Sequence, residues 1–243
     1  MYKQQRVSVV IPALNEAQSI VKVIEGLWQL SFQKLRIIDE IVVCDNGSTD
    51  GTAQLARIAG ATVVHESSCG YGRACLKALN AIKNTDIILF IDADHAFYAQ
   101  QALPLIDAIV EGTDLAIGSR VLGKMEEGAL SGPQKFGNQL ASFLIHLIWQ
   151  HKVSDLGPFR AINAASLLKL QMQDKTFGWT IEMQIKAIQN NMLISETPVD
   201  TRRRIGVSKI SGTVKGTLGA GIGILGMIAK LWWQQRKPVW VAS

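Results

Sequence analysis

Short apolar runs alternate with stretches of helical periodicity over the first half of the chain. The runs are rich in β-branched residues and predict buried strands at 7–11, 40–44, 61–65, 87–91 and 115–118. Between them, apolar residues recur at helical spacing, as in Ile20, Val23, Ile24 and Leu27. Because strand and helix alternate, the pattern predicts an α/β fold with a mostly parallel sheet flanked by helices on both faces.

The second half of the chain has a different rhythm. A Gly-rich stretch at 123–137 leads into an uncharged, helix-like segment at 136–151. A second uncharged segment at 216–229 is too short and too rich in glycine for a transmembrane span, which needs about 20 apolar residues, so we expect a packed or interfacial helix. The chain shows no linker and no internal repeat, which predicts a single domain at 1–205 and a basic C-terminal helical extension at 206–243.

Composition and charge narrow the class of protein. The 243 residues are 48% hydrophobic and 19% charged, which is typical of a folded protein rather than a disordered one. The net charge of +5 is uneven, because residues 200–243 contain eight basic residues and one acidic residue. This distribution indicates a localised anionic partner such as phosphate, nucleic acid or a lipid surface.

Three cysteines without a CxxC pair favour a reducing compartment, and the N-terminus has no signal-peptide pattern, so we expect a cytoplasmic protein.

Two acidic side chains follow the fourth predicted strand. Asp92 and Asp94 come directly after the run at 87–91 and are separated by one residue. Alternation along an extended chain sends both carboxylates to the same side, where they repel each other unless a proton or a cation lies between them. A divalent cation with oxygen ligands would resolve this conflict. The alternative is that both residues serve in a turn and a helix cap.

Two further strand ends carry polar groups. Asp45 follows the run at 40–44 and is a candidate to accept hydrogen bonds from a nucleobase or ribose, whereas Asp50 is placed to cap a helix. Asn15 and Glu16 follow the first strand, where capping of the first helix is the simpler interpretation. Because ligands of parallel sheets bind beyond the carboxyl ends of the strands, three polar strand ends on one edge predict a binding site there.

Eight segments match, in order, the motifs of one enzyme family. Those in the first half are PALNE at 12–16, VVCDNGSTDGT at 42–52, GYGRACLKALN at 70–80 and FIDADH at 90–95. Those further along are GSR at 118–120, DLGPFRAI at 155–162, GWTIEMQIKA at 178–187 and RRRIGVSKISGT at 202–213. The chain therefore resembles the inverting glycosyltransferases of family 2, which have the Rossmann-like GT-A fold of nucleotide-diphospho-sugar transferases. Within that family it is similar to the dolichyl- and polyprenyl-phosphate hexosyltransferases.

The resemblance implies metal-dependent transfer of a hexose from a UDP- or GDP-linked sugar to an acceptor, with a polyprenyl phosphate as one candidate. Asp92 and Asp94 match the DXD motif that holds Mg2+ or Mn2+ on the donor diphosphate, and Asp94 is counted among the catalytic residues. Residues 1–120 would bind the nucleotide sugar and residues 121–205 the acceptor. The positions carried over as substrate-binding are Pro12, Leu14, Glu16, Val43, Asp45, Asp92, Ala93, Arg120, Arg160, Arg204 and Lys209.

The acceptor stays open between two classes. A lipid phosphate is already anionic and needs no general base, whereas a soluble hydroxyl acceptor would need one, for which Glu182 and Asp155 are the candidates. The chain departs from the prenyl-phosphate pattern by having Leu14 in place of a frequent Tyr, Ala96 in place of a frequent Gln, and GPFR from Gly157 in place of SGFR. These departures leave the fold and the donor class intact and put the acceptor in question.

Rival classes explain less of the sequence. A haloacid-dehalogenase-like phosphatase also ends a strand in DxD, but here three strands precede the motif and no acidic GD motif follows Gly118. A non-enzymatic module that binds anionic surfaces through the basic tail would leave the acidic strand ends unexplained, and the same ends argue against a nucleic-acid partner.

Trp232 and Trp233 suit an interface, so peripheral contact with the inner face of the membrane is an alternative to a tail packed on the domain.

Overall fold

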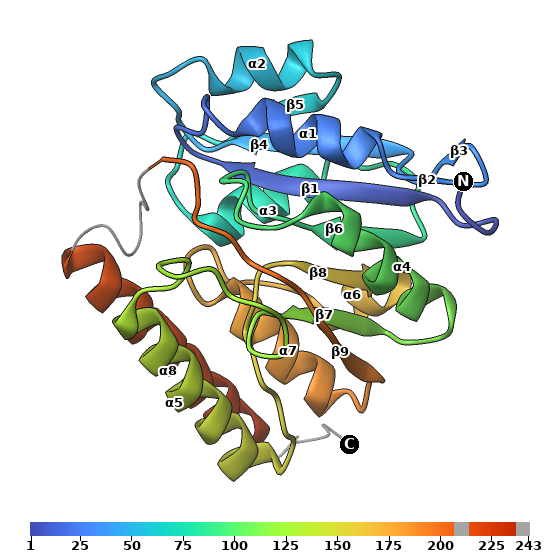
Figure 1. Ribbon diagram of the computed structural model, residues 1–243. Coiled ribbons are helices and arrows are strands. Elements are labelled where there is room, and N and C mark those ends of the chain that lie inside the picture. Colours follow the sequence, from blue (N-terminus) through green and yellow to red (C-terminus); the bar gives the residue numbers. More distant parts are fainter. Residues whose placement is uncertain (207–213, 237–243) are drawn as a thin grey trace, which may run out of the picture.

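The computed structural model describes residues 1–206 and 214–236, and a seven-stranded sheet lies at the centre of these ranges (Figure 1). In spatial order its strands are β5 (Thr62–His65), β4 (Glu40–Asp45), β1 (Val7–Ala13), β6 (Ile87–Phe90), β8 (Arg160–Asn163), β7 (Leu115–Ser119) and β9 (Ile194–Pro198). Within this sheet only β8 runs antiparallel to its neighbours, so the expected mostly parallel α/β sheet is confirmed. A separate hairpin joins β2 (Ser31–Phe32) and β3 (Leu35–Arg36).

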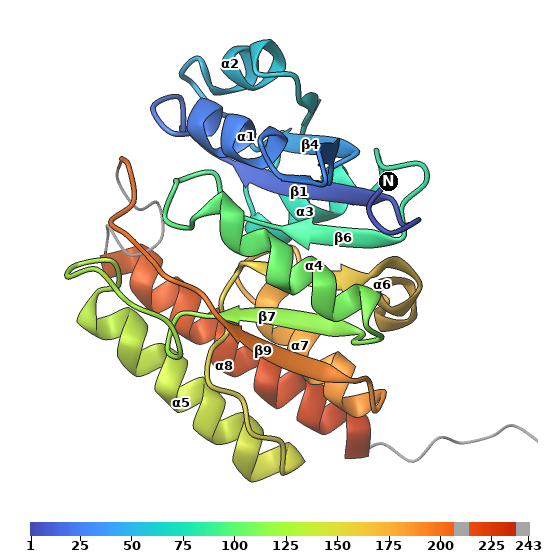
Figure 2. The same ribbon diagram turned by 45° about the vertical axis from the view of Figure 1, so that its right-hand side comes forward.

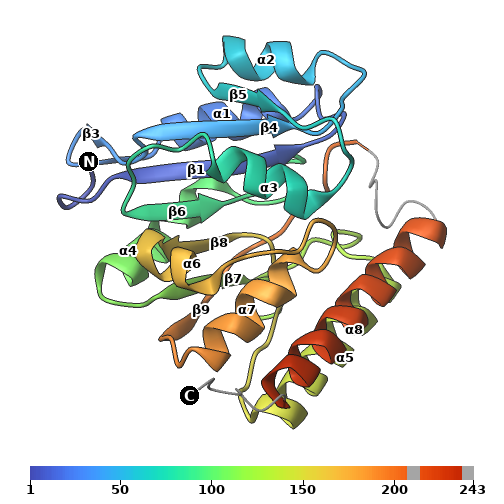
Figure 3. The ribbon, with the colours of Figure 1, turned by 180° about the vertical axis from the view of Figure 1, so that it is seen from behind.

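Helices cover both faces of the sheet. The first face carries α1 (Ile20–Trp28), α2 (Thr52–Ile58) and α4 (Ala102–Val110), the last preceded by the 3-10 turn η1 (Ala99–Gln101), and α1 and α4 face the viewer in Figure 1. The second face, seen in Figure 3, carries α3 (Tyr71–Leu79), α6 (Ala164–Leu170) and α7 (Trp179–Gln189). Alternation along β1 produces this division, because Val7, Val9 and Ile11 join the first core while Val10 joins the second.

All five strands predicted from apolar runs are present, whereas β8 and β9 were not predicted. β8 begins with Arg160, a residue type that is seldom fully buried. β9 has the sequence ISETP and lies half-exposed at the edge of the sheet. Neither strand shows the apolar run on which the prediction depended. Both strands form because pairing with their neighbours, β6 and β7 for β8 and β7 for β9, overrides a weak local preference.

Two long helices, α5 (Gly132–Trp149) and α8 (Val214–Arg236), lie side by side at one end of the molecule (Figure 2). Met227 and Leu231 of α8 are buried in a cluster with Ile145 of α5 and Ile181 of α7. The tail helix is therefore packed on the domain, which was one of the two alternatives. No helix in the described ranges is long and apolar enough to cross a bilayer.

Strand direction brings the candidate residues together. Six strands of the sheet point the same way, so the segments that follow β1, β4, β6, β7 and β9 converge on one edge. The segment that precedes β8 joins them there, because β8 runs in the opposite direction. Ligands of parallel sheets bind at this edge.

Candidate active site

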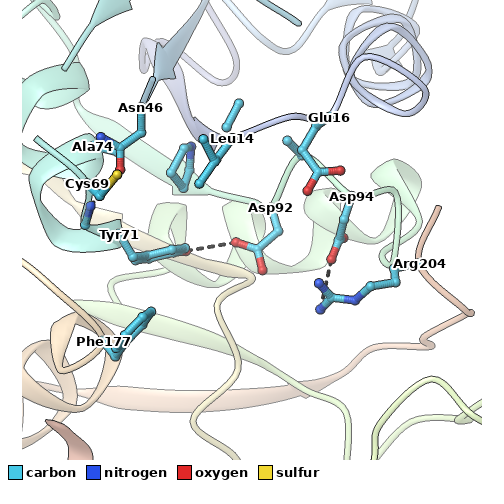
Figure 4. A pocket seen from close by; sticks show the side chains of 14 residues that line it. Leu14, Glu16, Asn46, Cys69, Tyr71, Ala74, Asp92, Asp94, Phe177 and Arg204 are labelled. Carbon is cyan, nitrogen blue, oxygen red and sulfur yellow. Dashed lines mark hydrogen bonds and ion pairs between the residues drawn. The ribbon is translucent and has the colours of Figure 1, made fainter. Parts of the chain in front are cut away.

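A cavity of about 320 Å³ opens beyond the carboxyl ends of β1, β4 and β6 (Figure 4). Seven residues carried over from the family motifs line it, namely Pro12, Leu14, Glu16, Asp92, Ala93, Asp94 and Arg204. The other lining residues were not assigned from the sequence, and they include Asn46, Cys69, Tyr71 and Phe177. The cavity thus gathers segments from both halves of the chain around the DXD loop.

The two carboxylates of the DXD loop have different neighbours. The hydroxyl of Tyr71 donates a hydrogen bond to Oδ1 of Asp92 at 2.9 Å. Oδ1 of Asp94 accepts the backbone N–H of Ala96 at 3.0 Å, and its Oδ2 lies 3.1 Å from Nη2 of Arg204. Burial and the charge of Asp94 raise the pKa of Asp92 to about 7. The positive charges near the two carboxylates therefore do not fully offset the burial and mutual repulsion of Asp92 and Asp94.

This pair fits a hard divalent cation such as Mg2+ or Mn2+. Such ions take oxygen ligands, and added positive charge would oppose the repulsion that raises the pKa of Asp92. In the part of the chain that the structure describes, no cluster of three or more His, Cys, Asp or Glu side chains could hold a metal. An ion at Asp92 and Asp94 would therefore need further oxygen ligands, which a donor diphosphate can supply.

A second cavity, of about 250 Å³, adjoins the first. The two share Tyr71, Asp92, Phe177 and Arg204. Arg120 lines the second cavity only. Further parts of its wall come from Gly137 and Asn138 of α5 and from Gly221 and Ile224 of α8. It therefore connects the carboxylates of the DXD loop with the α5 and α8 helix pair.

Asp155, one of the two candidate bases, is engaged in an ion pair in this structure. Its side chain is fully buried and holds Arg120 in a bidentate ion pair, with Oδ1 2.6 Å from Nη2 and Oδ2 2.7 Å from Nε. Oδ2 also accepts the backbone N–H of Arg120 at 2.8 Å. Both carboxylate oxygens are therefore occupied, and the ion pair holds Arg120 where it lines the second cavity.

Glu182, the other candidate base, is also placed differently from the expectation. Its side chain is 1% exposed, accepts the backbone N–H groups of Gln173 at 3.1 Å and Asp174 at 2.7 Å, and pairs with Lys186 at 2.7 Å. It lines neither cavity. The carboxylate of Glu182 therefore holds the loop that precedes α7.

The loop anchored by Glu182 packs closely against the start of α3. The N–H of Gly72 donates to the carbonyl of Thr176 at 3.1 Å, and a Cβ on Gly72 would lie 2.1 Å from the carbonyl oxygen of Asp174. Glycine is required here because no side chain fits between the two backbones. This contact places Tyr71 and Phe177 on the wall that the two cavities share.

Two other expected site residues, Arg160 and Val43, lie away from the two cavities. Arg160 is fully buried and donates to the carbonyls of Gly157 and Thr180, and burial lowers its pKa to about 10. Val43 is fully buried in the first core. Neither Arg160 nor Val43 lines a cavity at the DXD loop, and both are packed in the interior. Lys209 lies outside the described residues.

Asp45 lies beside the first cavity but does not line it. Its Oδ1 accepts the N–H of Ser48 and its Oδ2 lies 3.1 Å from Nδ1 of His65. Nη2 of Arg57 lies 2.7 Å from Nε2 of His65, and a guanidinium can only donate, so Nε2 accepts and Nδ1 carries the proton given to Asp45. The neighbouring Asn46 occupies the lining instead. In the sequence, Asn46 is followed by Gly47, a pair typical of a turn, which gives no sign of this position.

Comparisons with known proteins agree with this arrangement. The model of the family described as "Glycosyl transferase family 2" matches residues 8–170. The glycosyltransferase AglJ of Haloferax volcanii is 30% identical over 193 residues, which cover 79% of this chain and 61% of AglJ, so this chain spans less than two thirds of that relative. The polyprenol monophosphomannose synthase of Mycolicibacterium smegmatis is 29% identical over 229 residues, covering 86% of this chain and 82% of that protein.

A solved structure has a similar fold. The glucosyl-3-phosphoglycerate synthase from Mycobacterium tuberculosis, in complex with Mn2+, UDP and glucosyl-3-phosphoglycerate, matches with a TM-score of 0.72 at 23% identity. The match covers 93% of this chain and 81% of that one. The similarity therefore extends over most of the fold.

Proposed function

This chain belongs to glycosyl transferase family 2 and is a transferase, and we propose from that premise that it moves a hexose from a nucleotide-diphosphate sugar to a polyprenyl phosphate. Its fold is the GT-A fold implied by the sequence motifs. The observation that carries the choice of acceptor is the second cavity, which links Asp92 and Arg120 to the α5 and α8 pair. The polyprenol monophosphomannose synthase among the relatives supports the same choice.

In this proposal the first cavity binds the donor. Residues 1–120 supply most of its lining, with Pro12, Leu14 and Glu16 beside the nucleoside. Asp92 and Asp94 would hold Mg2+ or Mn2+, which would supply positive charge that stabilises the leaving nucleotide diphosphate. Because Asp92 lines both cavities, the diphosphate end of the donor would lie near the boundary with the second cavity.

The second cavity binds the acceptor, and residues 121–205 together with α8 form most of it. A hydroxyl acceptor needs a general base. Both candidate bases are already engaged, Asp155 by Arg120 and Glu182 by backbone N–H groups. A phosphate monoester is an anion at neutral pH and attacks without a base, and Arg120 is placed to attract it.

The reaction is a single displacement at the anomeric carbon. An oxygen of the acceptor phosphate forms a bond to that carbon while the bond from the carbon to the donor diphosphate breaks, through an oxocarbenium-like transition state. The bonding electrons leave with the nucleoside diphosphate. Attack from the face opposite the leaving group inverts the configuration, as in the inverting members of the family.

The helix pair is proposed to make peripheral contact with the cytoplasmic face of an anionic membrane. Among the side chains of α5 and α8 that the structure describes, the large exposed apolar ones are Phe136, Phe143, Leu147, Ile222, Leu225 and Trp233. Neither helix contains Asp or Glu, and Lys135, Lys230 and Arg236 are exposed. Apolar side chains together with cations favour an anionic lipid surface. Such contact would bring a lipid acceptor to the side of the molecule where the second cavity meets the helices.

A transfer assay with matched acceptors tests this function. Purified protein would be incubated with Mn2+, with UDP- or GDP-linked hexoses, and with either a short polyprenyl phosphate or the corresponding polyprenol. Mass spectrometry should detect a hexosyl phosphate ester of the first acceptor and no product from the alcohol. Transfer to the alcohol, or to soluble hydroxyl compounds alone, would contradict the proposed acceptor.

A further inference from the structure

Arg204 lies at the boundary of the two cavities and lines both of them. Its Nη2 is 3.1 Å from Oδ2 of Asp94, and its side chain is 31% exposed. The other oxygen of Asp94 accepts the N–H of Ala96. The guanidinium therefore takes the one carboxylate oxygen of Asp94 that the DXD loop itself does not use, as Figure 4 shows.

The backbone that carries Arg204 is fixed to the DXD loop. The N–H of Arg202 donates to the carbonyl of Ala96 at 3.0 Å, and the N–H of Ile205 donates to the carbonyl of Asp94 at 2.9 Å. These two bonds bracket Arg204. A change in its ion pairing is therefore a movement of the side chain, which has several rotatable bonds, and requires no movement of the loop.

The two neighbouring arginines are engaged differently. Nε of Arg202 donates to the carbonyl of His95 at 2.7 Å, and Nε of Arg203 donates to the carbonyl of Glu127 at 2.6 Å. Neither side chain lines the two cavities at the DXD loop. Of these three arginines, Arg204 alone has its guanidinium against a carboxylate of the site.

We infer that Arg204 is a built-in counter-ion of Asp94 that gives way to a divalent cation and then completes, with Arg120, a binding site for the acceptor phosphate. This inference rests on the proposed function. A dication held by Asp92 and Asp94 would lie close to the guanidinium, and like charges at that separation repel strongly in a half-buried site. Arg204 leaves Asp94 and stays within the second cavity, which it already lines beside Arg120.

The exchange has two measurable consequences. Before donor binding, Arg204 competes with the cation for Asp94, so the metal binds more weakly than the two carboxylates alone would allow. After donor binding, the displaced guanidinium adds a positive charge to the acceptor site, so the metal-bound donor and the phosphate acceptor strengthen each other's binding. Such coupling is reciprocal in free energy.

Metal titrations in the absence of donor test the first consequence. Mn2+ binding to wild type, Arg204→Gln and Arg203→Gln would be followed by calorimetry or by the loss of the free Mn2+ signal in electron paramagnetic resonance. Arg204→Gln should bind Mn2+ about tenfold more tightly than wild type, since removal of one nearby charge changes ion affinity on this order. Arg203→Gln removes the same charge from the adjacent residue and should match wild type. Circular dichroism would establish that each variant is folded.

Binding of farnesyl phosphate tests the second consequence. In wild type its affinity should rise about tenfold when Mn2+ and a nucleoside diphosphate are added, in line with typical coupling between sites. This gain should be absent in Arg204→Gln and retained in Arg203→Gln. Equal or weaker Mn2+ binding by Arg204→Gln would overturn the inference while the proposed function stands. Failure of wild type to bind Mn2+ at all, with or without a nucleotide, would overturn both.

Discussion

Tyr71 and Asp92 are joined by a 2.9 Å hydrogen bond at the wall that the two cavities share. Burial and the nearby Asp92 charge raise the pKa of Tyr71 well above its usual value, so the hydroxyl stays protonated and acts as the donor. The same bond lowers the pKa of Asp92 and opposes the larger effects of burial and of Asp94. Tyr71 thus helps to keep the first carboxylate of the DXD motif ionised.

Removal of this hydroxyl should weaken metal binding in a pH-dependent way. In Tyr71→Phe the pKa of Asp92 rises above about 7, so less of the ionised form is present at neutral pH. We expect Mn2+ affinity to fall several-fold at pH 7 and to approach that of wild type at pH 9, because a hydrogen bond to a charged group contributes about 1.5–3 kcal/mol. Tyr98→Phe is the matched control, since Tyr98 packs under Arg202 away from the two cavities. Equal loss at both pH values would contradict the explanation.

Asp92→Asn should stabilise the metal-free protein at high pH while abolishing transfer. The pKa of Asp92 is about 7 in the folded protein and about 3.9 in an unfolded chain. Because the folded pKa is raised, the cost of ionising Asp92 is absent below about pH 4, grows as the pH rises to about 7, and is constant above that. Asparagine avoids this cost, so Tm should rise by several degrees at pH 8 and change little at pH 4.5.

The matched variant for this experiment is Asp94→Asn. It also removes a carboxylate of the motif, but it leaves Arg204 without its ion-pair partner, so no comparable gain in Tm is expected. Thermal unfolding in the presence of EDTA at the two pH values measures the effect. A Tm of Asp92→Asn below that of wild type at pH 8 would show that ionised Asp92 is not a cost to the fold.

Local sequence patterns were sufficient for the strands of the first half and for the carboxylate pair. Both depend on residues close together in the chain, because an apolar run and the residues that follow it share one strand and one edge of the sheet. The positions of Leu14, Glu16, Asp92 and Asp94 around one cavity follow from the parallel strand order, since all four residues come after the carboxyl ends of strands.

The parts that could not be predicted depend on contacts between distant segments. Asp155 meets Arg120 across 35 positions, because β8 returns antiparallel beside β7. Phe177 reaches the cavity through a loop that packs on Gly72, a glycine whose motif indicated a nucleotide site but not this partner. Glu182 belongs to a family motif and lies on α7, a largely buried helix. Helical periodicity does not show which side chains of such a helix reach a cavity and which are buried against the loop before it.

Glu182 should behave as a positioning residue for the loop before α7. Glu182→Gln retains the shape of the side chain but weakens the bonds to Gln173 and Asp174 and removes the ion pair with Lys186. We expect the free energy of unfolding to fall by about 1–3 kcal/mol. The rate of transfer should decline modestly with an unchanged pH profile, since no proton passes through this group. A large loss of kcat with unchanged stability and a missing limb in the pH profile would instead identify a general base.

The exposed apolar side chains of α5 and α8 should control binding to anionic vesicles. Phe143 is 60% exposed and Trp233 is 63% exposed, and burial of a large apolar side chain contributes about 1.5–3 kcal/mol. Replacement of both by serine should therefore reduce the fraction that sediments with vesicles rich in phosphatidylglycerol by at least tenfold. The matched control is Leu168→Ser, which removes a side chain that is 79% exposed on α6, away from the helix pair.

The double variant should transfer hexose normally to a short, water-soluble polyprenyl phosphate and poorly to a long-chain acceptor embedded in vesicles. If wild type and the double variant sediment equally, the helix pair has no part in membrane contact. In that case the lipid acceptor reaches the second cavity by another face of the protein.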